Sequence, residues 1–252
     1  HVTPDMADAP PLGEFGRTLS LRLATSDGQL PAKTAEALAL PKVPLTDVDT
    51  NWLQVIGEGW AAPLKGFMRE SALLQALHFN SILIDPFDAV GAADLNGRQT
   101  SWETARHPPT RAALSVPIVL PVTSGTQAAI EAAGAEAVAL FDKDGALLGR
   151  LHRPEIYANR KEEIVARCFG AIDDGHPYIA HIYSGGDFLL GGEIELFEKM
   201  AYKDGLDQWR RTPKELYADF QAKGADVVFA FARGAVSRGS SHVPSPDARR
   251  GT

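Results

Sequence analysis

The side chains of this sequence that could carry out chemistry include seven histidines and a single cysteine. No two histidines are four positions apart, and four of them fall in different predicted elements: His78, His152, His176 and His181. A transition-metal site would therefore need several of them to converge in the fold. We interpret His78 as a half-buried structural histidine of a helix over 70–79, which is the commoner role on an apolar helix face.

Two glycine-containing segments resemble parts of known motifs. Residues 57–59 (Gly-Glu-Gly) supply only two glycines of G-x-G-x-x-G and are followed directly by Trp60, which makes cofactor binding there a poor interpretation. Residues 184–187 (Ser-Gly-Gly-Asp) could pair a nucleophile with an acid, but a Gly-Gly turn with a capping aspartate explains them better. The phosphate-binding G-x-x-x-x-G-K-[ST] and the nucleophile elbow G-x-S-x-G do not occur. We predict no catalytic, cofactor-binding or metal-ligating residue in this chain.

The carboxylates near position 195 give one further pattern. Glu193, Glu195 and Glu198 are interspersed with apolar residues, which predicts a solvated strand face, with paired-carboxylate catalysis as the open alternative. Cys168 is the sole cysteine, so it cannot form an internal disulfide or supply a multi-cysteine metal site. A reducing compartment is the simplest interpretation.

Composition narrows the classes of function. The 252 residues contain 25 Lys+Arg and 32 Asp+Glu, a net charge of −7 that disfavours nucleic-acid binding. A hydrophobic share of 44% is ordinary for a globular chain. No apolar run approaches the roughly 18 residues of a membrane span, and the first 30 residues show no secretory signal. We expect a cytoplasmic or plastid protein with no membrane partner. Because the sequence begins at His1, we expect that the natural start is missing, which leaves open that a transit peptide was lost with it.

Apolar periodicity predicts a mixture of helices and hairpins. Leu73, Leu74 and Leu77 place a core-facing helix over 70–79, and a capping box of Ser124 and Gln127 begins a helix that stops near Gly134. Residues 136–141 and 146–151 form a hairpin around an Asp-Lys-Asp-Gly turn, and 188–197 is a second β region.

Two further helices are predicted from their first residues. Asn159 is expected to cap a helix over 160–169, and Thr212 with Pro213 begins another that stops at Gly224. The apolar run 227–231 then suits a buried, parallel strand. The fold class is α+β, followed by only the beginning of an α/β domain.

These signals divide the chain into segments. We expect a poorly ordered lead-in over 1–30, a folded domain over 31–222 with an inserted loop at 85–113, the start of a second domain at 223–231, and a disordered tail at 232–252. The tail carries four arginines that we interpret as solvated and not as a phosphate site: Arg233, Arg238, Arg249 and Arg250.

Several long segments together resemble the amino-terminal domain of ATP sulfurylase (sulfate adenylyltransferase), as found in eukaryotes and in bifunctional PAPS synthetases that also carry APS kinase. They are WLQVIGEGWAAPLKGFMRE at 52–70, LHFN at 77–80, LSVPIVL at 114–120, EIY at 155–157, RKEE at 160–163, GDFLLGG at 186–192, YKDGLDQ at 202–208 and ADVVFAF at 225–231. The resemblance implies a PUA-like β-barrel with flanking helices, then the first strand of a Rossmann-like nucleotidyltransferase domain. It also implies a place in sulfate assimilation, where ATP with magnesium reacts with sulfate to give adenosine 5′-phosphosulfate and pyrophosphate.

The sequence departs from the family where its catalytic motif is expected. The family's Q-x-R-N-P-x-H-x-G-H follows the strand that ends here at Phe231. Without a gap its glutamine, arginine and two histidines fall on Ala232, Gly234, Arg238 and Ser241. A shift of one residue matches His242 alone.

Two hypotheses follow from this departure. The first is a truncated or altered ATP sulfurylase that is inactive alone, with no cofactor bound by this chain. The second is a non-catalytic interaction module that forms a homo-oligomer or associates with full-length sulfurylase subunits. A third interpretation, RNA binding, is suggested only by the PUA-like name, and the charge of −7 opposes it.

Overall fold

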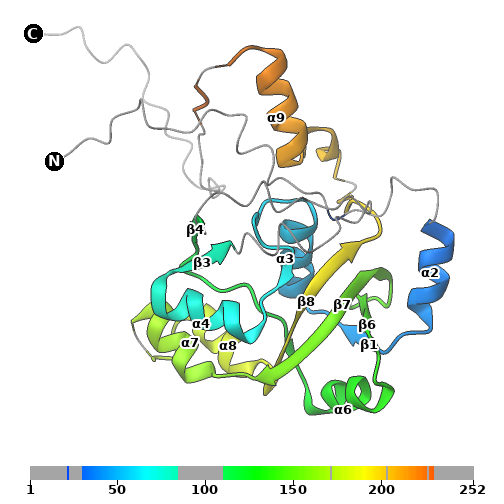
Figure 1. The fold of residues 1–252 in the computed structure, drawn as a ribbon, viewed down its shortest axis with the longest axis vertical. Coiled ribbons are helices and arrows are strands. Elements are labelled where there is room, and N and C mark those ends of the chain that lie inside the picture. The colour runs from blue at the N-terminus through cyan, green and yellow to red at the C-terminus, as the bar shows by residue number, and fades with distance from the viewer. Residues whose placement is uncertain are drawn as a thin grey trace, which may run out of the picture. The chain divides into compact units, whose positions relative to one another are not determined.

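The computed structural model describes residues 22, 30–84, 110–170, 172–202, 204–225 and 227–229 (Figure 1). The helices are α2 (Leu30–Leu38), α3 (Asp47–Gly57), α4 (Glu70–Phe79), α6 (Ser124–Ala133), α7 (Lys161–Phe169), α8 (Pro177–Ser184), the 3-10 helix η4 (Asp207–Trp209) and α9 (Pro213–Ala222). The strands are β1 (Lys42–Pro44), β2 (Gly66–Phe67), β3 (Ser81–Ile84), β4 (Thr110–Ala113), β5 (Pro121–Val122), β6 (Ala137–Phe141), β7 (Leu147–Ala158) and β8 (Phe188–Leu196). The chain divides into two compact units, 1–217 and 218–252.

One six-stranded sheet organises the first unit. Its strand order is β1-β6-β7-β8-β2, and β5 also pairs with β8 on the side of β2. All of these pairs are antiparallel except β1 with β6. Among the described strands, the two edges of the sheet do not pair with each other, so the closed barrel that the resemblance implies is not seen. The predicted hairpin around 142–145 is confirmed as β6 and β7.

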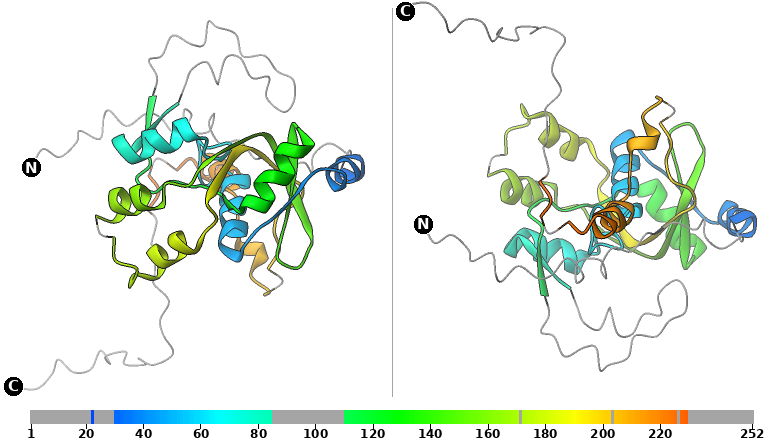
Figure 2. Two further views of the ribbon diagram at one scale, coloured as in Figure 1. Left: turned by 90° about the horizontal axis from the view of Figure 1, so that it is seen from below. Right: turned by 90° about the horizontal axis from the view of Figure 1, so that it is seen from above.

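Apolar side chains from the sheet and from the helices α3, α4, α6 and α7 form the core. The main cluster joins Leu53 of α3, Ile130 of α6 and Leu151 and Ile194 of the sheet, all buried. A second cluster joins Leu73 of α4 and Ile164 of α7 to the C-terminal end of β7 and the adjacent N-terminal end of β8. Helices α4, α7 and α8 accordingly gather at that end of the two long strands (Figures 1 and 2).

Glycines permit the close approach of the paired strands β2 and β8. Gly66 pairs with Glu193, and a Cβ on Gly66 would overlap the carbonyl oxygen of Gly192. Gly192 itself has a φ of 157°, and a Cβ there would overlap the Leu151 side chain and the carbonyl oxygen of His152. The strands can therefore approach closely only because these positions have no side chain.

The helix ends test the predicted caps. The helix over 70–79 is confirmed as α4, and Thr212 caps α9 with Glu215 in a reciprocal capping box. The predicted cap of α6 is wrong by one residue, because Thr123 and not Ser124 accepts the free amide, that of Thr126. The predicted cap at Asn159 is also wrong.

Asn159 has a different partner from the one a helix cap requires. Its side-chain amide donates to the carbonyl oxygen of Gly186 at 2.8 Å, and α7 begins at Lys161 without a side-chain cap. The position thus links the turn before β8 to the end of β7.

The prediction of an inserted loop over 85–113 is wrong for its last four residues. Residues Thr110–Ala113 form β4, which pairs antiparallel with β3, so this part of the segment is a hairpin arm. Residues 85–109 lie outside the described residues, as do the tail 232–252 and, apart from residues 22 and 30, the lead-in 1–30.

The strand predicted at 227–231 is not observed in its described part. Residues 227–229 are not in a strand, and Val227, Val228 and Phe229 are exposed. A parallel strand is stabilised by neighbours on both sides, and no described strand pairs with this segment.

Replacement of two glycines by alanine should change stability in opposite directions. Gly66→Ala should lower the free energy of unfolding by about 3 kcal/mol, because the new methyl overlaps the backbone of β8. Gly125→Ala in α6, where the nearest atom is 3.8 Å away, should raise it by about 0.5–1 kcal/mol. Denaturant unfolding of both variants checks this, and equal effects would contradict the assigned crossing of β2 and β8.

Candidate functional site

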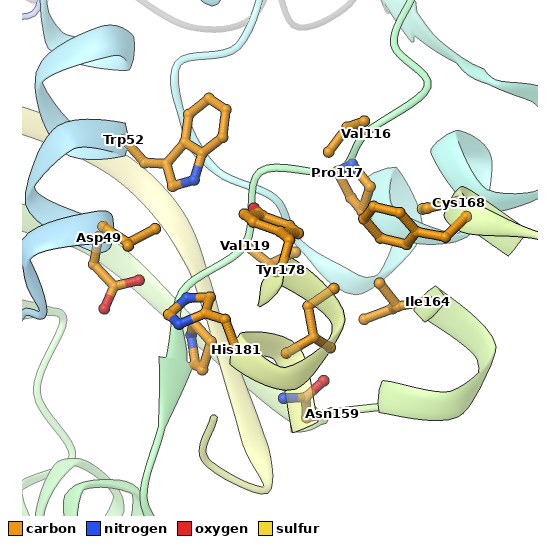
Figure 3. A pocket seen from close by; sticks show the side chains of 14 residues that line it. Asp49, Trp52, Val116, Pro117, Val119, Asn159, Ile164, Cys168, Tyr178 and His181 are labelled. Carbon is orange, nitrogen blue, oxygen red and sulfur yellow. The ribbon is translucent and has the colours of Figure 1, made fainter. Parts of the chain in front are cut away.

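A narrow apolar cleft lies between α3, α7 and α8 (Figure 3). Its volume is about 40 Å³, which holds a few water molecules and not a nucleotide. Figure 3 shows Asp49 and Trp52 reaching from α3 toward His181 and Tyr178 of α8. The other lining residues are Val48, Val116, Pro117, Val119, Pro121, Asn159, Ile164, Cys168, Phe169 and Ile182.

The one carboxylate of this cleft has a structural role. Asp49 is buried, and its Oδ2 accepts hydrogen bonds from the Thr46 amide at 3.1 Å and the Thr46 hydroxyl at 2.6 Å. Burial raises the pKa of Asp49, against the hydrogen bonds from Thr46 that favour the charged form. The residue closes the capping box of α3, so this carboxylate is already engaged as a helix cap.

The cleft does not form a nucleophile and base pair. Burial raises the pKa of the Cys168 thiol, which keeps it in the unreactive protonated form. The Ser184 hydroxyl donates to the carbonyl of His181 at 2.9 Å, while Asp187 pairs with Lys161 at 2.9 Å. The Ser184 hydroxyl and the Asp187 carboxylate are therefore engaged in local structure, but the printed partner of the Asp187 side chain is Lys161 and not the backbone amide that the predicted capping role requires.

The most densely charged cluster lies on β7 and β8. The buried carboxylate of Glu195 accepts from Lys33 Nζ at 3.0 Å and from Arg150 Nε at 2.5 Å, and His152 Nε2 lies 3.4 Å away. Arg150 also pairs with Glu36 at 3.3 Å. Since Lys33 and Glu36 belong to α2, this cluster fastens α2 to the sheet.

The prediction that the glutamates form a solvated strand face is wrong for Glu195. Glu198 is exposed, but only 4% of the Glu195 side chain is accessible. The hydrogen bond with His152, and those with Lys33 and Arg150, lower the pKa of Glu195 to about 2, although burial opposes them. With its oxygens engaged, Glu195 cannot act as a general base. The basic side chains at 150 and 152 on the partner strand are the sequence signal of this burial.

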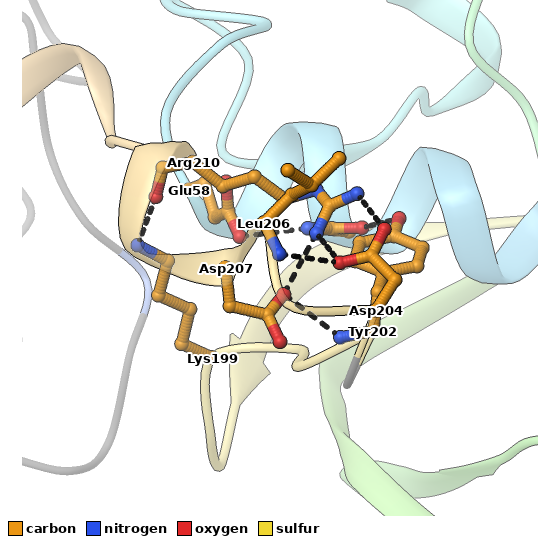
Figure 4. A network of polar contacts seen from close by, with 8 residues as sticks. Glu58, Lys199, Tyr202, Asp204, Leu206, Asp207 and Arg210 are labelled. Atoms are coloured by element: carbon orange, nitrogen blue, oxygen red, sulfur yellow. Dashed lines mark hydrogen bonds and ion pairs between the residues drawn. The ribbon is translucent and has the colours of Figure 1, made fainter.

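A second polar network holds the loop 202–210 (Figure 4). Arg210 donates to both oxygens of Asp204, at 2.7 and 2.6 Å, and to Asp207 at 2.9 Å. The guanidinium also lies over the Tyr202 ring, 4.4 Å from its centroid. Hydrogen bonds from Arg210 keep the pKa of Asp204 well below its ordinary value.

The structure does not bring the predicted histidines together as ligands. His78 is exposed and lies 3.5 Å from Glu163, which corrects the half-buried position expected for it. His152 contacts Glu195, and the His176 ring accepts the amide of Tyr178 at the start of α8. Within the described ranges, no group of three histidine, cysteine or acidic residues could hold a metal ion. In the same ranges, no helix has the length and apolarity needed to cross a membrane.

The comparisons with known proteins agree with this sheet-based fold. Residues 11–199 match the family model described as a PUA-like domain. The chain belongs to the PUA-like domain family.

The relatives of this PUA-like chain carry sulfurylase names. It is 39% identical over 212 residues to "ATP sulfurylase 2" of Arabidopsis thaliana, covering 84% of this chain and 40% of the relative. It is 35% identical to "ATP sulfurylase 4, chloroplastic" of the same plant, covering 86% and 41%. The resemblance to ATP sulfurylase is thus confirmed, and the PUA-like chain spans about 40% of the length of these relatives.

One solved structure is also similar. "Hexameric APS kinase from Thiobacillus denitrificans" aligns with a TM-score of 0.49 and 20% identity over 82% of the PUA-like chain and 31% of that chain.

Acid should unfold the PUA-like chain partly through Glu195. Its pKa of about 2 in the folded state lies below the ordinary value of 4.5, so its contribution is complete above about pH 5 and is lost as the pH falls toward 2. Glu195→Gln should remove about 3 kcal/mol at pH 7 and flatten this part of the pH dependence. Glu198→Gln, at an exposed position, is the matched control. Parallel pH curves of the wild type and Glu195→Gln would refute the assignment.

Proposed function

We propose that this chain is the PUA-like module of a sulfate-activating protein and that by itself it does not form adenosine 5′-phosphosulfate. The observation that carries this proposal is the pairing of ATP sulfurylase relatives with a 252-residue sequence that lacks Q-x-R-N-P-x-H-x-G-H. ATP with magnesium, and sulfate, are then substrates of the nucleotidyltransferase part and are not held by this chain.

The chemistry of the reaction supports an inactive module. Sulfate is a weak nucleophile, so a catalyst must align it with the α-phosphorus and neutralise the phosphate charge with convergent donors. A wider, open groove of about 410 Å³ is lined by Arg150 and Arg153, but both are already paired: Arg150 with Glu195 and Glu36, and Arg153 with Glu193. The narrow cleft beside α8 is apolar and too small for a triphosphate.

The proposed location is the cytoplasm or a plastid. The word "chloroplastic" in the name of ATP sulfurylase 4 belongs to that relative and supports the plastid alternative here.

The purified chain should give no molybdate-dependent release of pyrophosphate from ATP above background. The physical reason is the lack of the Q-x-R-N-P-x-H-x-G-H motif, whose side chains would have to converge on the triphosphate. ATP sulfurylase 2, assayed in parallel, is the positive control. Turnover that disappears in a variant with Arg238→Ala and His242→Ala would overturn the proposal, because it would place a working site in the tail.

A second candidate function is association with full-length sulfurylase subunits. It is favoured by the exposed apolar run Val227, Val228 and Phe229, in which 82% of Phe229 is accessible. Contiguous exposed apolar residues are a common feature of protein interaction surfaces.

Co-elution with full-length ATP sulfurylase 2 tests this second candidate. We expect the chain to elute with the larger protein in size-exclusion chromatography and Phe229→Ser to weaken the complex about tenfold or more, because a buried aromatic anchor is lost. Val116→Ser, at an exposed position in the first unit, should have no effect. Separate elution of the two proteins at micromolar concentration would reject the candidate.

A further inference from the structure

A row of aromatic rings forms one wall of the cleft between α3, α7 and α8. The Tyr178 ring lies beside those of Phe169 and His181, with 5.8 Å between its centroid and each of theirs. Trp52 reaches toward this row from α3 on the other side (Figure 3). Because the faces of aromatic rings carry partial negative charge, a cleft between such rings suits a cation better than an anion.

The polar atoms of the cleft that lack a hydrogen-bond partner are acceptors. Thr46 donates twice to the side chain of Asp49, and both bonds go to Oδ2, so Oδ1 has no donor among the described residues. The side-chain amide of Asn159 donates to Gly186, while its Oδ1 is buried and has no partner in the same part of the chain. A buried acceptor without a donor is unfavourable, so the ligand that suits this cleft brings N–H groups.

The charge of the cleft is that of one carboxylate. Asp49 is only 5% exposed, and burial raises the pKa of its carboxyl group. His181 is the side chain of α8 whose charge acts on this carboxylate. No lysine or arginine is among the described residues that line the cleft. A cation held beside Asp49 therefore stabilises the ionised form that burial alone disfavours.

The size of the cleft limits the occupant. Its volume is about 40 Å³, and a water-sized group of atoms needs about 10–15 Å³, so the cleft holds about three heavy atoms. One ammonium nitrogen and two carbons match this number. The lining beyond the rings includes Val48, Pro121 and Ile182, which suits the carbons. A hard metal ion is a poor occupant, because it takes six or more oxygen ligands.

We propose that the cleft between α3, α7 and α8 binds a small alkylammonium ion of about three heavy atoms. The ammonium group donates to Asp49 Oδ1 and lies against the rings of Trp52 and Tyr178, and the carbons fill the apolar remainder of the cleft. Binding closes α3 onto α8 around a charge that the folded chain otherwise leaves unpaired. The site lies outside the chemistry of sulfate activation, so the proposal is independent of the proposed function.

The test measures the unfolding temperature of the 252-residue chain with ethylammonium chloride. A ligand that binds only the folded chain raises this temperature, and a Kd on the order of 1 mM should raise it by about 5 °C at about 50 mM ligand. Ethanol has as many heavy atoms and no charge, so ethanol, like sodium chloride at the same concentration, should give a shift of at most about 1 °C. The buffer is held at about pH 8, above the range in which histidine side chains ordinarily carry a proton.

Substitutions in α3 locate the bound ion. Asp49→Asn keeps an oxygen for the bonds from Thr46 but removes the charge, so the ethylammonium shift should fall to that of ethanol. Asp47→Asn, in the same first turn of α3 but exposed and paired with Lys143, is the matched control and should keep the full shift. Trp52→Leu retains an apolar side chain without the ring and should weaken binding about threefold to tenfold.

The outcomes that overturn the proposal are distinct. The absence of a shift with ethylammonium, or an equal shift with ethanol, shows that the cleft holds only water or neutral molecules. A full shift in Asp49→Asn shows that the ammonium ion binds elsewhere on the chain. If Asp49→Asn does not fold, because it weakens the cap of α3, Trp52→Leu decides in its place, and binding of unchanged strength in that variant overturns the proposal.

Discussion

The antiparallel pairing of β7 with β8 is the interaction on which the rest of the structure depends. β8 pairs with β7 from Phe188 to Leu196 and carries β2 and β5 on its other side. Its end also binds the backbone of Arg22, whose carbonyl accepts the Leu196 amide at 2.7 Å. Because β8 has neighbours on both sides along most of its length, its side chains include some of the most deeply buried of the fold, and the glycines at its centre allow the strand β2 to approach.

The charged residues of this sheet stabilise the fold and are not arranged for a reaction. Glu195 binds cations from α2 and β7. The short helix α2, in which only Ala37 is buried, is therefore held to the sheet mainly by its polar side chains, together with Leu30 at its start and Leu40 beyond its end. A buried carboxylate is costly to leave unpaired. The cluster around Glu195 therefore brings together residues that lie more than a hundred positions apart in the sequence. The same engagement removes these groups from acid and base chemistry.

The exposed surfaces give the protein its other distinctive property. Large apolar side chains are accessible at Trp60, Tyr202, Leu206 and Trp209 and at 227–229. Arg210 binds Asp204 and Asp207 in the loop that carries three of them. A module with several large apolar side chains exposed, and with Trp60 and Tyr202 held by hydrogen bonds, is suited to contact another protein surface. This agrees with a chain whose relatives are about two and a half times as long as the part it matches.

The sequence by itself determined the local elements and the family. The spacing of apolar residues, the turn residues and the cap residues predicted α4, the hairpin of β6 and β7, and the start of α9. These elements depend on contacts between residues that are close together in the chain. The matched segments predicted the ATP sulfurylase relatives. Only the tertiary structure decided that Glu195 is buried, that Asn159 binds Gly186 and not a helix end, and that 110–113 is a strand. Each of these depends on a partner distant in sequence: Lys33, Gly186 and β3 lie 162, 27 and about 30 positions away, and local pattern carries no record of such partners.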